Sequence, residues 1–268
     1  MPTNFKTTHL PKVEKTVYRL GIAGNCGINS SDIEWAAEQG ANYWIWGASY
    51  KKVAAGIRQV IRQDREKQVV AMLGWGVFGW QIRKNVEKAL RQLNTDYLDV
   101  FKLGWLGKMS SDRQGLIDTL LELKREGKIR MIGTSIHDRA RAGRIALDSE
   151  IDLLMVRYNA KHTGAEQDIF PHLAERNPAL IAYTALAWKQ LTRPLKGLGT
   201  LPLTPELCYR FVLSNPHVHL ALTGPANREQ LKDNFAALEL GPLTAEEMEQ
   251  VRAYGRQVKA KKKLDYVR

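Results

Sequence analysis

Eight short apolar runs, separated by longer segments with the apolar spacing of helices, restrict how this chain can fold more than any other feature. Strands that alternate with helices are typical of βα units, whose strands form a parallel sheet. The runs lie at residues 17–24, 42–46, 68–75, 97–104, 129–136, 152–159, 179–186 and 218–225. Eight such units predict an α/β fold, a closed (β/α)8 or TIM barrel, which needs about 250 residues. The 268 residues of the chain suffice for one barrel.

The segments between the runs read as amphipathic helices, with apolar residues at positions such as 53, 57, 60 and 61. Ser110 or Ser111 can cap the helix before the fifth run, and Gly127 suits its C-terminal end. A loop rich in proline and glycine follows the seventh run at 188–203. No linker divides the chain, so we expect one domain over residues 1–268, with its strands within 17–225 and an added C-terminal helix at 244–262.

Composition limits the classes of protein and the cellular compartments that fit this chain. The chain is 44% hydrophobic and 25% charged, as ordinary globular proteins are. No apolar run approaches the roughly 20 residues of a membrane span, and the N-terminal stretch lacks the apolar core of a secretory signal. Cys26 and Cys208 are too few for a disulfide scaffold or a thiolate metal site. We expect a cytoplasmic protein with no membrane partner and no bound metal.

The formal net charge of +12 allows nucleic acid, anionic lipid or a phosphate-bearing cofactor as a partner. The most basic stretch is the C-terminal tail VKAKKKLDYVR, which we interpret as a solvated terminus. Elsewhere lysine and arginine stand beside acidic residues on the predicted helices. Nucleic acid is therefore the least favoured partner.

Residues that follow the carboxyl ends of the strands form the active site of such a barrel. Four tryptophans fall at this rim: Trp46, Trp75, Trp105 and Trp188. They are consistent with an aromatic-walled pocket for a flat or apolar ligand. Ordinary packing of the barrel top is the equally weighted alternative.

Four segments resemble the aldo-keto reductase superfamily, in the order expected along the chain. They are NVEKALRQLNTDYLDVFKLGW (85–105), LKREGKIRMIGTSI (123–136), IAYTALAWKQL (181–191) and TGPANREQLKDN (223–234). The resemblance implies a barrel that reduces carbonyl groups with NADPH through a tetrad of Asp, Tyr, Lys and His. Aligning GANYWIWGASYK (40–51) with the family motif places Tyr50 at the tyrosine that donates the proton.

The other three members of the tetrad are absent. Ile45 falls at the aspartate, Gly74 at the lysine and Gly104 at the histidine. A buried Asp–Lys pair is tolerable, whereas either residue alone costs several kcal/mol, so their joint absence is consistent with removal of a whole reaction centre. Losing a positioned stabiliser typically costs about 3–4 kcal/mol of barrier. We therefore expect carbonyl reduction by the family mechanism to be slow or absent.

The resemblance also implies an NADP site that is weak or lost. Its candidate residues are Ser135, Tyr183, Gly224, Asn227, Arg228, Gln230 and Asn234. The ring of Tyr183 would stack on the nicotinamide, and Arg228 could reach the 2′-phosphate and favour NADPH over NADH. Ile136 and Met155 replace an asparagine and a glutamine of the family, so the nicotinamide end should be poorly held.

Two cations on the strands are predicted to face the barrel interior. Lys102 shares its side of the strand with Gly104, and Arg157 shares its side with Met155. Buried cations need a partner, which is either an internal carboxylate or an anionic ligand. If Lys102 replaces the missing lysine, its ammonium should lie near the Tyr50 hydroxyl and lower the pKa of that phenol.

His137 and His162 lie at the same rim and are acid–base candidates or ordinary loop histidines. With them, the candidate catalytic set is Tyr50, Lys102, His137, Arg157 and His162.

Three functions remain open. The first is an NAD(P)-dependent oxidoreductase with altered catalytic residues that acts on a small carbonyl or alcohol. The second is a redox-neutral lyase, isomerase or hydrolase that acts on an anionic small molecule. The third is a non-catalytic pseudoenzyme that uses the barrel as a binding scaffold.

Overall fold

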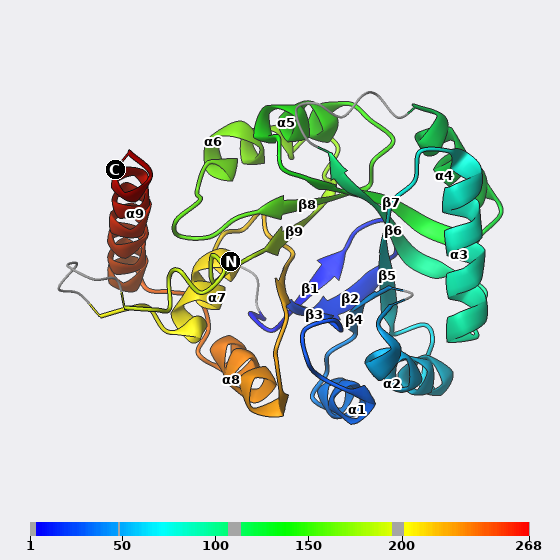
Figure 1. Ribbon diagram of the computed structural model, residues 1–268, viewed down its shortest axis with the longest axis horizontal. Coiled ribbons are helices and arrows are strands. Elements are labelled where there is room, and N and C mark those ends of the chain that lie inside the picture. The colour runs from blue at the N-terminus through cyan, green and yellow to red at the C-terminus, as the bar shows by residue number, and fades with distance from the viewer. Residues whose placement is uncertain (1–3, 48, 107–113, 195–200, 268) are drawn as a thin grey trace.

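The computed structural model describes residues 4–47, 49–106, 114–194 and 201–267, with side chains undescribed at 105, 106, 114 and 262–267. Eight parallel strands form a closed barrel in the order β10-β3-β4-β5-β6-β7-β8-β9 (Figure 1). Their bounds are β3 Leu20–Ala23, β4 Tyr43–Trp46, β5 Val69–Gly74, β6 Leu98–Leu106, β7 Ile129–Ile136, β8 Leu153–Arg157, β9 Ala179–Tyr183 and β10 Leu220–Thr223. Each lies within, or within two residues of, a predicted run, so the predicted barrel is confirmed.

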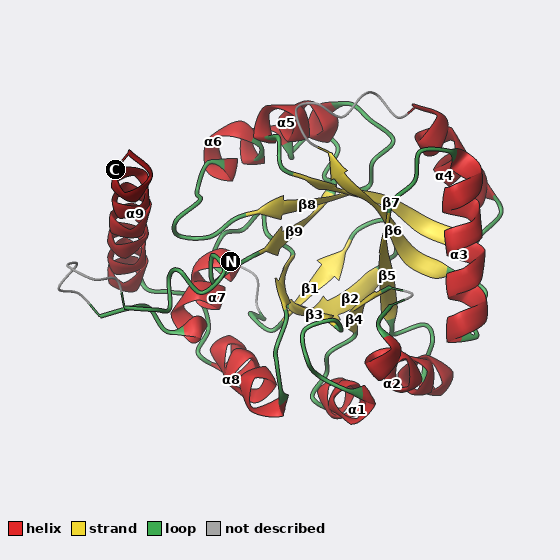
Figure 2. Cartoon of the chain, in the orientation of Figure 1, coloured by secondary structure: helices red, strands yellow, loops and turns green. Residues whose placement is uncertain are grey.

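Helices surround the barrel, and the added C-terminal helix extends further than predicted (Figure 2). Their bounds are α1 Ser30–Glu38, α2 Lys51–Gln63, α3 Gly79–Leu93, α4 Gln114–Arg125, α5 Arg139–Leu147, α6 Ala165–Asp168, α7 Pro205–Leu213, α8 Arg228–Glu239 and α9 Ala245–Val267, with a 3-10 turn at Phe170–His172. Gly127 has a φ of +74°, as expected just after a helix end. The capping role predicted for Ser110 or Ser111 lies outside the described residues. None of the helices in the described ranges has both the length and the apolar character needed to cross a bilayer.

An N-terminal hairpin was not predicted. Strands β1 (Thr7–Leu10) and β2 (Lys15–Tyr18) pair antiparallel, so residues 17 and 18 belong to the hairpin and not to the first barrel strand. Leu10, Val13 and Val17 are buried against the residues that fill the barrel. Figure 1 shows the hairpin lying across the barrel strands. It covers the apolar N-terminal end of the barrel, which water would otherwise reach.

A buried ionic cluster fixes the same end. The carboxylate of Asp99 is fully buried and lies 2.8 Å from Nζ of Lys15 and 2.9 Å from a guanidinium nitrogen of Arg65. It also accepts a 2.9 Å hydrogen bond from the backbone N–H of Val70. Because its oxygens have several donors, the buried charge of Asp99 is compensated.

Side chains alternate between two hydrophobic clusters. One fills the barrel and includes Tyr43, Ile45, Ala71 and Met155, and the other lies between the sheet and the helices. Trp46 belongs to the outer cluster and is 2% exposed, which favours the packing alternative for this residue. Trp75 and Trp188 are 49% and 59% exposed at the rim, while the Trp105 side chain is outside the described part.

Candidate active site at the barrel mouth

Tyr50 lies at the C-terminal end of the barrel, where β4 leads into α2. Its half-buried ring packs against the residues that fill the barrel and lies 3.3 Å from the position of a Cβ at Gly47. It lines a cleft of about 630 Å³ with Cys26, Lys51 and Lys52. Burial raises the pKa of Tyr50, with the nearby Cys26 thiol acting in the same direction. The phenol is therefore protonated at neutral pH and can donate a hydrogen bond.

The residues that the resemblance places at the three other tetrad positions, Ile45, Gly74 and Gly104, carry no polar side chain. Ile45 is in the inner cluster. A Cβ at Gly74 would instead meet the ring of Phe101, which belongs to the outer cluster. Alternation on β5 makes Leu73 the inward residue, and it pairs with Lys102 in the register. Leu73 is therefore the residue of β5 that faces the barrel interior beside Lys102, and Gly74 faces the helices.

The space above Gly104 is filled by a tryptophan. A Cβ at Gly104 would collide with the indole of Trp75, which directly follows the neighbouring strand β5. No side chain at position 104 can therefore occupy this part of the mouth while Trp75 keeps its position.

Lys102 points into the barrel as predicted and is fully buried. Its Nζ lies 3.8 Å from Sδ of Met155 and 5.9 Å from the centre of the Tyr43 ring. Gly133 makes room for it, since a Cβ there would lie 2.8 Å from Cγ of Lys102. No carboxylate in the described ranges forms an ion pair with it, and burial lowers the pKa of Lys102 to about 7.

The predicted effect of Lys102 on Tyr50 is wrong. The pKa of Tyr50 is raised rather than lowered, and its causes are burial and Cys26, with no contribution from Lys102. The contacts of the Lys102 ammonium are instead Met155 and Tyr43. The stem of Lys102 packs over Gly133 of β7, and its ammonium lies beside Met155 of β8.

Arg157, His137 and Tyr183 form a second polar group at the mouth. The Tyr183 hydroxyl is hydrogen-bonded to Nδ1 of His137 at 2.9 Å, and their rings meet edge to face. Arg157 pairs with Tyr183 in the register of β8 and β9, and its guanidinium lies 6.0 Å from the Trp188 ring. No described carboxylate is in ion-pair distance of Arg157. Burial and the Arg157 charge lower the pKa of His137, so its imidazole is neutral near pH 7.

His162 is a poor acid–base residue at neutral pH. Burial, followed by the charges of Arg157 and Lys161, lowers the pKa of His162 to about 4. Its backbone N–H donates to Oδ1 of Asn159 at 2.9 Å within a tight turn. Burial and the positive charges of Arg157 and Lys161 therefore keep His162 neutral at this rim.

A left-handed backbone turn positions Trp188. Ala187, Trp188 and Lys189 have φ values of 47°, 54° and 66°. Left-handed conformations cost about 1–2 kcal/mol per non-glycine residue and occur disproportionately at functional sites. No local pattern predicts this turn, because none of the three residues is a glycine or asparagine.

The residues of the predicted cofactor loop have partners within the protein. Asn227 caps α8 by accepting from the N–H of Gln230 at 3.0 Å, and Gln230 accepts from the N–H of Ala226 at 3.0 Å. Asn234 donates to the Thr223 hydroxyl at 2.7 Å. These bonds fix the loop after β10.

Gly224, Arg228 and Ser135 complete the predicted cofactor set. Gly224 leaves room for the thiol of Cys26. Arg228 forms a 2.6 Å ion pair with Asp32, which the sequence could not predict because 196 positions separate the two. Ser135 is fully buried, and its hydroxyl has no hydrogen-bond partner among the described residues. The Tyr43 hydroxyl, also buried without a described partner, is a polar group that the sequence analysis missed.

A closed parallel barrel with polar side chains gathered at its C-terminal mouth defines the class of the protein, a (β/α)8 barrel with a site at the strand ends. The family profile of the aldo/keto reductases matches residues 33–194 and 202–256. The chain belongs to the aldo/keto reductase family.

Two of the curated relatives are methylglyoxal reductases. The chain is 24% identical over 194 residues to the NADH-specific methylglyoxal reductase of Escherichia coli K12, covering 59% of this chain and 60% of that protein. It is 29% identical over 150 residues to the methylglyoxal reductase YeaE of the same organism, covering 55% and 51%. The chain thus spans between half and two thirds of the length of these relatives.

Solved structures share the fold over almost the whole chain. The holo form of aldo-keto reductase AKR11C1 from Bacillus halodurans superposes with a TM-score of 0.77 at 24% identity, covering 93% of this chain and 96% of that one. An aldo/keto reductase from Klebsiella pneumoniae in complex with NADP and acetate gives 0.74 at 24% identity, covering 94% and 95%.

Proposed function

We propose that the protein is a nicotinamide-dependent oxidoreductase that acts on a small carbonyl or alcohol substrate with an altered catalytic set centred on Tyr50. The observation that carries this proposal is the position of Tyr50: its phenol borders an open cleft at the mouth, and no described residue hydrogen-bonds its hydroxyl. Membership of the aldo/keto reductase family, and the names of the curated relatives, support the reaction type.

Tyr50 acts in this proposal as a neutral hydrogen-bond donor to the carbonyl oxygen. Its raised pKa keeps the proton on the phenol, while Ile45 and Leu73 offer no charge that would help to transfer it. Donors that are positioned in advance stabilise an oxygen on which negative charge develops. A single donor without a neighbouring cation supports slower reduction than a complete tetrad does.

A nicotinamide cofactor, when bound, supplies the hydride. The buried Ser135 hydroxyl, which has no described partner, fits a carboxamide, and the half-buried ring of Tyr183 offers a stacking surface. The loop after β10 would hold the adenosine end. We propose weak binding, because Met155 and Ile136 offer no amide to the nicotinamide.

A second function is favoured by the charge around Arg157. The protein would then be a redox-neutral enzyme whose anionic substrate binds Arg157 and, deeper in the barrel, the Lys102 amine. Arg157 and Lys102 are cations without a described carboxylate partner, and buried or half-buried cations are stabilised by an anion. His137 would be the neutral acid–base residue of this site.

Binding and turnover experiments separate these functions. We expect NADPH fluorescence to change on titration with the protein, and methylglyoxal to be reduced slowly. The Tyr50→Phe variant should reduce methylglyoxal at least about ten-fold more slowly than the wild type and keep its cofactor affinity. Tyr97→Phe, at the far end of the barrel, should change neither the rate nor the affinity.

A fluorescence response without any reduction would refute a role of Tyr50 in chemistry. No response at millimolar NADPH or NADH would refute the oxidoreductase and leave the redox-neutral enzyme or the non-catalytic scaffold.

A further inference from the structure

The loop between β5 and α3 exposes a group of large apolar side chains. Val77, Phe78 and Trp80 are 78%, 59% and 63% exposed, and Trp75 is 49% exposed. We call Val77, Phe78 and Trp80 the apolar tip. Isolated apolar residues are common on protein surfaces, whereas contiguous ones indicate an interaction site.

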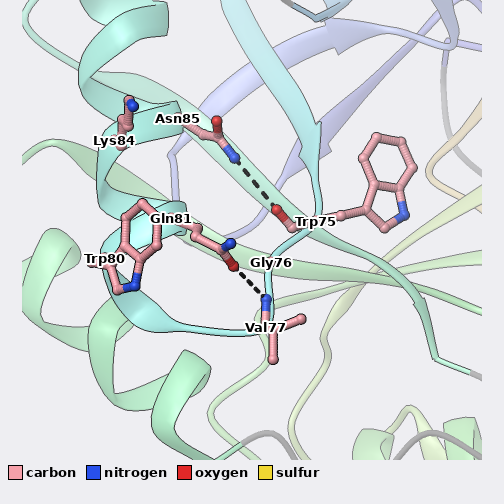
Figure 3. A pocket seen from close by; sticks show the side chains of 7 residues that line it. All are labelled: Trp75, Gly76, Val77, Trp80, Gln81, Lys84 and Asn85. Atoms are coloured by element: carbon pink, nitrogen blue, oxygen red, sulfur yellow. Dashed lines mark hydrogen bonds between the residues drawn. The ribbon is translucent and has the colours of Figure 1, made fainter.

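The apolar tip is held in this exposed arrangement. The side-chain oxygen of Gln81 accepts hydrogen bonds from the backbone N–H groups of Val77 at 2.7 Å and Phe78 at 3.1 Å. Figure 3 shows Val77 and Trp80 on either side of Gln81, with Lys84 one turn further along α3. Together with Trp75 they line a shallow hollow of about 540 Å³. The loop therefore presents its apolar side chains without having to rearrange.

Exposed lysines flank the apolar tip on the side of α2 and along α3, while Glu122 of the neighbouring helix α4 forms an ion pair with Arg83 of α3. Neither residues 47–63 nor residues 74–86 contain an aspartate or glutamate. Lys51 and Lys52 begin α2 and Lys84 lies in α3, and all three are exposed. Since β4 and β5 are parallel neighbours, the loops that follow them and the first turns of α2 and α3 lie at the same end of the barrel. Lys84 lines the same hollow as Val77 and Trp80, and Lys51 and Lys52 lie at the same end of the barrel, beside the neighbouring cleft.

We propose that the apolar tip and the surrounding lysines, Lys51, Lys52 and Lys84, dock the protein peripherally on an anionic lipid bilayer. Tryptophan and phenylalanine favour the membrane interface, where an apolar ring borders on water. A short apolar insertion alone gives marginal, reversible binding, and a basic patch that attracts anionic headgroups supplies the second contribution that stable attachment needs. From the sequence we expected no membrane partner, because the exposure of Val77, Phe78 and Trp80 is visible only in the structure.

Two other occupants fit this surface less well. A second copy of the chain would bring the lysines of two molecules opposite each other, and like charges across an interface are unfavourable. Nucleic acid binds chiefly through contacts between basic side chains and phosphates, whereas the centre of this surface is apolar. A bilayer with anionic headgroups satisfies both the apolar tip and its charged border.

Vesicle sedimentation tests the proposal with the full chain. We expect the wild type to bind phosphatidylglycerol vesicles, to release them as salt is raised, and not to bind phosphatidylcholine vesicles. Replacing Phe78 and Trp80 together by serine should lower the partition coefficient at least about ten-fold. The control is Leu240→Ser, because Leu240 is also 59% exposed but ends α8 at the opposite end of the barrel, and it should bind as the wild type does.

A second variant separates the charge from the apolar tip. Replacing Lys51, Lys52 and Lys84 by glutamine should abolish the preference for anionic vesicles, with the melting temperature unchanged in all variants. The proposal fails if the wild type binds neither kind of vesicle, or binds both equally. It also fails if the Phe78/Trp80 variant binds as well as the wild type, or if the wild type is a dimer that this variant converts to monomers.

Discussion

Nε of Arg228 donates to Oδ1 of Asp32 over 2.6 Å and so joins the first turn of α8 to the first turn of α1. The same guanidinium donates to the Ser31 hydroxyl at 3.0 Å, while Oδ2 of Asp32 accepts from the backbone N–H of Asn29. Asp32 is almost buried and therefore held in place. A 2′-phosphate that approaches Arg228 meets this carboxylate as well.

The Asp32→Asn variant should therefore bind NADPH more tightly. Removing the negative charge leaves Arg228 uncompensated for a phosphate, whereas NADH has no phosphate at this position. We expect a small preference for NADPH in the wild type and an increase of about ten-fold in the variant, measured by fluorescence titration with both cofactors. An equal gain in affinity for NADH and NADPH would show that Arg228 does not contact the 2′-phosphate.

The Lys102→Met variant should be more stable than the wild type at pH 7. Burial lowers the pKa of Lys102 from 10.5 to about 7, so between these values the unfolded chain holds a proton that the folded chain lacks. Wild-type stability should fall as pH drops from 10.5 towards 7, and the variant should lack this slope. Thermal melts against pH measure it.

Lys15→Met is the contrasting variant. Lys15 pairs with Asp99, so this change should destabilise the protein. Loss of activity or anion binding in Lys102→Met, together with its gain in stability, would indicate that the lysine is retained for function. Full activity would make Lys102 a structural residue.

His219 should make stability depend on pH in the acid range. Burial, followed by the charge of Arg19, lowers the pKa of His219 from 6.5 to about 4, and its Nδ1 accepts from the N–H of Leu180 at 3.1 Å. As pH falls from 6.5 to 4, the unfolded chain takes up a proton before the folded chain does, so the free energy of unfolding decreases by up to about 3 kcal/mol. His219→Asn, whose side-chain oxygen can accept the same bond, should flatten this part of the profile in urea denaturation. An unchanged profile would contradict the assignment.

Asp99→Asn should destabilise the protein strongly. Removing the carboxylate leaves Lys15 and Arg65 without their buried counter-charge, and breaking a buried ion pair costs about 3–5 kcal/mol. The exposed pair of Asp64 and Lys67 provides the control, since Asp64→Asn should change little. If Asp99→Asn and Asp64→Asn lowered the free energy of unfolding equally in chemical denaturation, the buried cluster around Asp99 would stabilise the protein no more than an exposed ion pair does.

Most of the barrel could be predicted because its strands are buried on both faces. Runs such as 68–75 and 179–186 are almost wholly apolar, and turns separate them from segments of helical spacing. The hairpin at β1 and β2 escaped detection because its second strand runs directly into β3, so residues 17–24 form one apolar run with no turn residue between them.

The candidate site was predicted less completely. Strand alternation predicted the inward direction of Lys102, which is fully buried beside Met155. The partner of Arg228 depends on a contact between distant segments, which no local pattern records. The facing of β5 emerged only from the structure: because successive side chains face opposite ways, Leu73 faces the interior and Gly74 faces the helices.

The indole of Trp75 above Gly104 makes those two positions interdependent. A histidine placed at 104 finds its space taken, and a smaller residue at 75 alone leaves that space empty. A side chain can therefore enter this part of the mouth only if both positions change, and Gly104→His introduced by itself should destabilise the fold. The chain is thus sterically committed to its present mouth, and a designer who wished to place a polar group at position 104 would have to begin with Trp75.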